Sequence, residues 1–117
     1  MNVQIYGKNL SLTAALKSYI EGKIGKLDHY HDRIIDAKVE IAHDPKHHSG
    51  KIFYAEANIK VPGGLVRAIE WAEDEYAAID MVEQKLIEQL RKYKGKQEGK
   101  WKRLKDKLNF KRWLGRE

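Results

Sequence analysis

The sequence predicts an α+β domain with the element order β-α-β-β-β-α, in which a four-stranded sheet carries two helices packed on one face. Two observations predict this fold. Apolar and polar residues alternate in the ranges 2–6, 35–43, 51–61 and 65–71, as in strands with one buried face. In 13–30 and 73–94, apolar residues recur every three or four positions, as in helices with one buried stripe. A single sheet with both helices on one side buries all of these stripes.

The first strand and the first helix form one unit. Val3 and Ile5 lie on one side of the strand, and the hydroxyl of Thr13 is suited to cap the helix that follows a turn at Gly7-Lys8-Asn9. The apolar stripe of this helix comprises Leu16, Ile20, Ile24 and Leu27. Gly22 and Gly25 weaken the helix by up to ~1 kcal/mol each relative to alanine. The right-handed crossover rule predicts that the first strand lies beside the second and parallel to it.

The middle of the chain reads as a hairpin followed by one more strand. In the second strand Ile35, Ala37, Val39 and Ile41 share a side, which is expected to face the core. A polar loop over 44–50 leads to the third strand, and Pro62-Gly63-Gly64 makes a tight turn. The phase of the fourth strand is open, because either Val66 and Ala68 or Leu65, Ile69 and Trp71 can face the core.

The second helix is expected to begin near Glu73-Asp74-Glu75, where the helix dipole favours negative charge. Its predicted apolar stripe comprises Tyr76, Ile79, Val82, Leu86, Leu90 and Tyr93. Tyr76 is therefore expected to be a core residue. Gly95 is a suitable C-terminal cap. Residues 1–94 are therefore expected to form one domain.

The remaining residues, 95–117, carry the entire net charge of +6. This tail holds nine basic and three acidic residues, whereas the rest of the chain holds fourteen of each. Such asymmetry indicates a neutral body with a basic arm for a polyanion. Lysine and arginine mixed with tryptophan favour nucleic acid, through Lys100, Trp101, Lys102, Arg103, Lys107, Lys111, Arg112 and Trp113. A membrane-surface helix, a partner-binding helix and a frayed terminus remain open.

Basic residues on the two predicted helices form a second candidate site for a polyanion. If the helices pack side by side, their outer faces make one basic strip that could neutralise RNA phosphates. The alternative, that these lysines only solvate the surface, stays open on this pattern alone. The candidates are Lys23, Lys26, Lys85, Arg91, Lys92 and Lys94, with Lys8 and Lys17 as weaker members.

Few residues favour an enzyme. The absence of cysteine excludes disulfides, thiolate zinc sites and thiol nucleophiles. The histidines, including His47 and His48, lack a recognised ligand spacing and are expected to be exposed loop residues, so no metal or other cofactor is expected. The carboxylates of Asp80 and Glu83 offer no catalytic pattern, and no nucleophile elbow or phosphate-binding glycine loop is present. With no secretory signal and no membrane-spanning apolar run, the expected compartment is the cytoplasm.

Several motifs carry a family resemblance over roughly residues 1–94. Asn2-Val3-Gln4-Ile5 with Gly7-Lys8-Asn9 and Leu12-Thr13-Ala14-Ala15-Leu16 resembles the opening of the bacterial ribosome hibernation-promoting factor and ribosome-associated inhibitor family, sigma-54 modulation protein-like in its short form. Lys23-Ile24-Gly25-Lys26-Leu27-Asp28 with Tyr30 resembles the helix-one motif of this family. Asp74-Glu75-Tyr76-Ala77-Ala78-Ile79-Asp80, followed by Lys85-Leu86 and Gln89-Leu90, resembles its helix-two motif.

The resemblance implies a fold like that of a double-stranded-RNA-binding domain, and a function. Members bind the small ribosomal subunit and its rRNA in the decoding region, compete there with mRNA and tRNA, and idle ribosomes in stress or stationary phase. On matching positions, Lys23, Lys26, Lys85, Arg91, Lys92 and Lys94 would contact rRNA. No small-molecule substrate, catalysis or membrane partner is implied, although a module that binds a protein or membrane through the tail remains the alternative.

Overall fold

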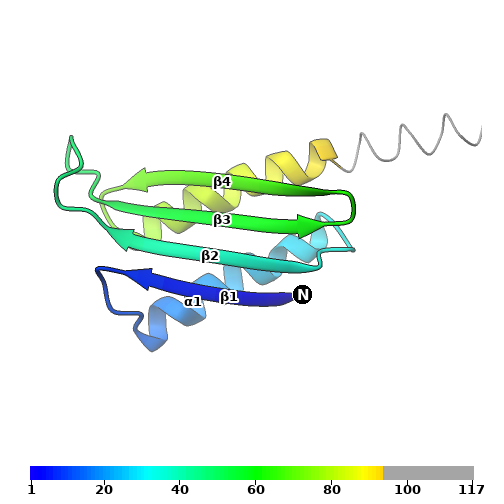
Figure 1. The fold of residues 1–117 in the computed structure, drawn as a ribbon, viewed down its shortest axis with the longest axis horizontal. Coiled ribbons are helices and arrows are strands. Elements are labelled where there is room, and N and C mark those ends of the chain that lie inside the picture. Colours follow the sequence, from blue (N-terminus) through cyan, green and yellow to red (C-terminus); the bar gives the residue numbers. More distant parts are fainter. Residues whose placement is uncertain (94–117) are drawn as a thin grey trace, which may run out of the picture.

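The computed structural model describes residues 1–93, and the predicted element order is confirmed. Four strands form one sheet in the order β1-β2-β3-β4, namely β1 (Asn2–Lys8), β2 (Asp36–His43), β3 (Phe53–Val61) and β4 (Gly64–Ala72). β1 pairs with β2 in parallel, as predicted, and the other two pairs are antiparallel. Helix α1 (Ala14–Gly25) and a second helix over 75–93 cover the same face of the sheet (Figure 1).

Helix α1 begins at the predicted cap. The Oγ1 atom of Thr13 accepts a hydrogen bond from the backbone N–H of Leu16 at 3.1 Å, which satisfies one of the free N–H groups of the first turn. Leu16, Ile20 and Ile24 are buried against the sheet. The chain then tightens into a 3-10 turn, η1 (Lys26–His29), which buries Leu27. The single predicted helix is therefore two consecutive elements with one apolar stripe.

The structure settles the phase of β4. Ile59 lies opposite Val66 and Ala57 lies opposite Ala68, so these residues share the face that packs against the helices. Val66 and Ala68 are buried, whereas Leu65 is 60% exposed on the other face. The core lies between this face of the sheet and the two helices.

Two residues predicted to face the core lie at the surface instead. Ile35 is 49% exposed, because β2 begins one residue later and Ile34 supplies the buried side chain at this point. Tyr76 is 36% exposed, since the buried stripe of the second helix starts at Ala78 and Ile79. The Tyr76 ring packs edge-on against Tyr19 of α1, with the centroids 4.9 Å apart.

The second helix is fixed at both of its described ends. Asp74 Oδ1 accepts from the N–H of Ala77 at 2.8 Å, which confirms the acidic start. Near residue 93, the amide of Gln89 donates to the carbonyl of Arg67 on β4 at 2.8 Å. The predicted cap at Gly95 lies outside the described residues. Within residues 1–93, no helix combines the length and apolar character needed to cross a membrane.

Candidate nucleic-acid interface on the two helices

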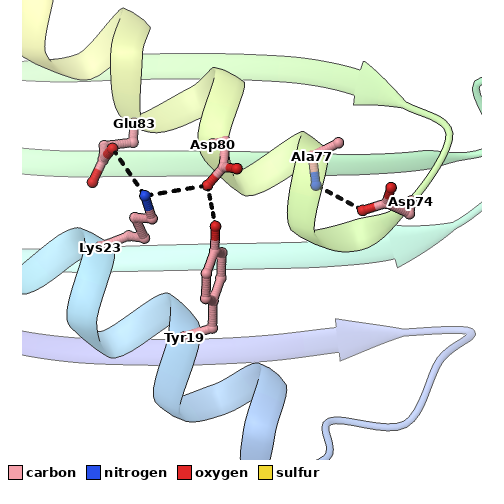
Figure 2. Close-up of polar contacts among 6 residues, drawn as sticks. All are labelled: Tyr19, Lys23, Asp74, Ala77, Asp80 and Glu83. Carbon is pink, nitrogen blue, oxygen red and sulfur yellow. Dashed lines mark hydrogen bonds and ion pairs between the residues drawn. The ribbon is translucent and has the colours of Figure 1, made fainter.

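The two helices meet along a polar seam that consists of Tyr19, Lys23, Asp80 and Glu83 (Figure 2). The Tyr19 hydroxyl donates to Asp80 Oδ1. The Nζ atom of Lys23 lies 3.4 Å from that oxygen and 3.7 Å from Glu83 Oε1. Successive turns of α1 and of the second helix supply these side chains, since Tyr19 and Lys23 are four residues apart and Asp80 and Glu83 are three apart.

The charged groups of the seam interact mainly with one another. The negative charge of Glu83, together with that of Asp80, raises the pKa of Lys23 above its ordinary value, against the opposing effect of burial. Glu83 has the larger effect despite its slightly longer distance, because its side chain is 14% exposed and Asp80 is 45% exposed. The hydrogen bond to Asp80, followed by burial, raises the pKa of Tyr19. With one cation and two carboxylates, the seam carries a net negative charge.

The structure therefore interrupts the single basic strip expected along the helices. Lys23 faces two carboxylates, and Lys85 forms an ion pair with Glu70 of β4. Lys92 lies 3.5 Å from Glu88, one turn earlier on the same helix. The local run of lysines does not reveal these acidic partners, because they come from other elements or from the neighbouring turn, and RNA binding by the paired lysines stays a prediction.

The cations without such partners lie elsewhere on the helices. Lys17, Lys26 and Arg91 are exposed and form no ion pair with any of residues 1–93. Both helices run in the same direction, so their C-terminal ends lie at one end of the molecule (Figure 1). Lys26 follows α1 at this end, and the Arg91 guanidinium lies 5.1 Å from the ring centroid of Tyr30. Stacking of this kind orients the guanidinium and leaves its N–H groups available to an anion.

Two other sets of candidate residues are separate from this end. Lys8 alternates with the core-packed Val3 and Ile5, which places it on the sheet face away from the helices. Lys94 and all the tail candidates, from Lys100 to Trp113, lie outside the described residues. The structure thus groups Lys26 with Arg91 and leaves the role of every candidate a prediction.

Of the histidines expected to be exposed loop residues, His48 is exposed in its loop, whereas His31 and His47 are not exposed. His47 lies in the loop between β2 and β3 but is half-buried: its ring lies flat on Trp71, with centroids 3.6 Å apart, and its Nδ1 donates to the carbonyl of Lys51 at 2.7 Å. His31 is buried and accepts from the N–H of Arg33 through Nδ1. Stacking and local hydrogen bonds account for both positions. In residues 1–93, no three histidine, aspartate or glutamate side chains are grouped to hold a metal ion.

Sequence reasoning missed the acidic half of the seam and the role of Tyr30. The sequence pattern predicts neither the pairing of Asp80 and Glu83 with Lys23 nor the stacking of Arg91 on Tyr30. A signal was nevertheless present, because Tyr76, Asp80 and Glu83 recur at helical spacing beside the buried stripe, as Tyr19 and Lys23 do on the other helix. Two such rows on adjacent helices are expected to meet.

Comparison with known proteins identifies the family. The family described as sigma 54 modulation protein / S30EA ribosomal protein matches residues 3–98. The ribosome hibernation promotion factor of Deinococcus radiodurans is 38% identical over 91 residues, which cover 78% of this chain and 48% of that protein. The factor of the same name from Bacillus subtilis is 40% identical over 96 residues, or 82% of this chain and 50% of that protein. The chain spans about half the length of the curated relatives it matches.

Solved structures agree in fold. The N-terminal domain of Thermus thermophilus Protein Y matches with a TM-score of 0.70 and 37% identity, over 80% of this chain and 99% of that one. A ribosomal subunit interface protein from Coxiella burnetii matches with a TM-score of 0.71 and 26% identity, over 81% of this chain and 99% of that one. Because the family match spans most of the chain, the protein belongs to the sigma 54 modulation protein / S30EA ribosomal protein family.

Proposed function

We propose that this chain binds the small ribosomal subunit in the decoding region, blocks the places of mRNA and tRNA, and promotes ribosome hibernation in the cytoplasm of stressed or resting cells. The curated relatives are named ribosome hibernation promotion factors, and a similar solved structure is described as a ribosomal subunit interface protein. The family match over residues 3–98 includes both helices of this chain. No bond needs to form or break, since occupancy alone excludes the competing ligands.

One observation carries the proposal for this chain: Lys26 and Arg91 are exposed, free of ion pairs within residues 1–93, and located at the shared end of the two helices. Cations without carboxylate partners neutralise phosphates at the smallest cost, because no existing pair has to be broken. Each phosphate contact releases condensed counterions and makes binding weaken as salt rises. Folded RNA is recognised in this way mainly by its shape and backbone.

The test is sedimentation of purified small subunits with the full chain at several salt concentrations. The variant Lys26→Glu with Arg91→Glu is expected to lose binding by about tenfold or more, and its salt dependence is expected to fall by about 0.9 in log–log slope per lost contact. Lys38→Glu with Lys60→Glu is the matched control. It makes the same change in charge at exposed positions of the opposite sheet face.

Two outcomes contradict the proposal. One is binding by the chain that does not weaken as salt rises. The other is equal loss of binding by the helix variant and the sheet variant, which would mean that only the total charge matters. Circular dichroism of each variant establishes that the fold is retained.

A further inference from the structure

The polar seam lies between the two helices, next to the end that carries the proposed RNA contacts: Lys23 is three residues before Lys26 on the chain, and Glu83 is eight residues before Arg91. Lys23 of α1 reaches across to the second helix, where its Nζ lies 3.4 Å from Asp80 and 3.7 Å from Glu83 (Figure 2). The aromatic ring of Tyr19 lies 5.4 Å from the same nitrogen. The Lys23 ammonium therefore contacts two carboxylates and one aromatic ring within the protein.

Contacts within the seam also hold the side chains of Tyr19 and Lys23 in place. Asp80 accepts from the Tyr19 hydroxyl while it pairs with Lys23, so one carboxylate holds side chains from two successive turns of α1. Glu83 is largely buried and turned toward Lys23 rather than into solvent. Extraction of Lys23 toward a phosphate would leave two carboxylates close together without their cation, which is unfavourable in a partly buried place. A phosphate brought to the seam would meet a net negative charge.

We propose that Asp80 and Glu83 make the seam a selectivity filter, which disfavours phosphate-dense nucleic acid and admits an RNA surface that presents hydrogen-bond donors there. Carboxylate oxygens accept from 2′-hydroxyls and from base amino groups, both of which folded RNA exposes. Phosphates would then be neutralised at nearby cations without ion-pair partners among residues 1–93, such as Lys26 and Arg91. This inference rests on the proposed function, because it assigns the discrimination between ribosomal and other nucleic acid to two carboxylates of the same surface.

The filter makes affinity for the small subunit independent of affinity for unrelated nucleic acid, whereas a purely cationic surface would raise or lower both together. On a cationic surface, every added positive charge raises affinity for all polyanions together. With the filter, removal of the two carboxylates raises affinity for an unrelated duplex and gives no gain on the subunit, where the seam already has suitable partners. The ratio of the two affinities therefore reports the filter directly.

The experiment compares Asp80→Asn with Glu83→Gln, made together, against wild type in the full chain. Each amide keeps the shape of its carboxylate, and the amide oxygen at position 80 can still accept from Tyr19. The probes are purified small subunits and a double-stranded RNA of unrelated sequence. Glu21→Gln with Asp28→Asn is the matched control. Glu21 of α1 and Asp28 of η1 are both exposed, and neither pairs with a cation among residues 1–93.

The seam variant is expected to bind the unrelated duplex about three- to tenfold more tightly than wild type. Its salt slope on the duplex should steepen by about 0.9, since Lys23 gains one phosphate. Subunit affinity should stay equal or fall. Addition of Lys23→Gln to the seam variant should abolish the gain on the duplex, which identifies Lys23 as its source.

Three results would overturn the inference. Equal duplex affinity for the seam variant and its control would mean that the seam does not act on nucleic acid. An equal gain on duplex and subunit would mean that the carboxylates reduce affinity without selecting. Wild-type protein that binds subunits no better than duplex would end the proposed function and the filter with it, and the duplex measurements distinguish this last failure from the first.

Discussion

The hydroxyl of Tyr93 donates a hydrogen bond to the backbone carbonyl of Pro62 at 2.5 Å, which ties the second helix to the turn between β3 and β4. The turn is shaped for this contact, because Gly63 has a positive φ of 80° and Gly64 lies against the ring. A Cβ at Gly64 would meet Cε2 of Tyr93 at 3.1 Å. The contact therefore fixes the end of the helix that carries Arg91.

Replacement of Tyr93 by Phe should lower the free energy of unfolding by about 0.5–1.5 kcal/mol, toward the lower end because water can reach the freed carbonyl. Gly63→Ala should cost about 1 kcal/mol or more, since alanine is strained at positive φ. Urea unfolding followed by circular dichroism measures both. Unchanged unfolding midpoints in both variants would mean that the helix end is not anchored at this turn.

The adjacent residues Ile34 and Ile35 provide a matched pair for the core. Ile34 is 8% exposed and Ile35 is 49% exposed. Ile34→Ala is therefore expected to destabilise the protein by about 2–4 kcal/mol, because it leaves a cavity, whereas Ile35→Ala should change stability by about 0.5 kcal/mol or less. Equal losses, or the larger loss at Ile35, would mean that the alternation over 35–41 begins one residue earlier than in the structure.

Stability should fall at alkaline pH through the seam. Folding raises the pKa of Lys23 above its ordinary 10.5 and that of Tyr19 above its ordinary 10.0, so the folded state holds both protons more tightly. Their contribution is complete below the unfolded values and is lost as the pH rises through the raised folded values. Melting temperatures measured across this window should decline less steeply in Tyr19→Phe than in wild type.

Tyr6→Phe is the control for this titration, since Tyr6 is exposed on the other sheet face and bonds only to Gln4 among the described residues. It should follow the wild-type curve. An alkaline decline that is identical in wild type and in both variants would show that Tyr19 does not contribute.

Deletion of residues 95–117 tests the basic tail. These residues carry the entire net charge of +6, so their loss should weaken binding to the small subunit and reduce its salt dependence. The melting temperature should change little, because residues 1–93 contain a buried core of their own. Full retention of affinity would make the tail dispensable for the ribosome, and complete loss, with tail-dependent capture by anionic liposomes, would favour a membrane role instead.

Much of the fold was predictable because its signals are local. The cap at Thr13, the acidic start of the second helix and the alternation of β2 and β3 depend on residues close together in the chain, and the structure confirms them. The phase of β4 was open because both of its faces carry apolar side chains, and only pairing with β3 decides between them. Tyr76 was predicted in the core because it continues the helical spacing of the stripe, whereas burial in the second helix begins at Ala78 and Ile79.

The candidate site was less predictable because its charges are paired over long distances. Lys23 and Glu83 are sixty residues apart, and Lys85 meets Glu70 only because the second helix packs beside β4. A count of lysines on a helix therefore overstates the free positive charge. Arg91 and Lys26 stand out only after the paired residues have been identified.

The most direct test of the proposed function is competition on the purified small subunit. Labelled tRNA bound to subunits with mRNA is titrated with the full chain, and the tRNA that remains bound is measured by filter retention. We predict that the chain displaces tRNA completely, and that Lys26→Glu with Arg91→Glu does so only at concentrations about tenfold higher or more. Stable complexes that hold the chain and tRNA together on one subunit would contradict steric exclusion.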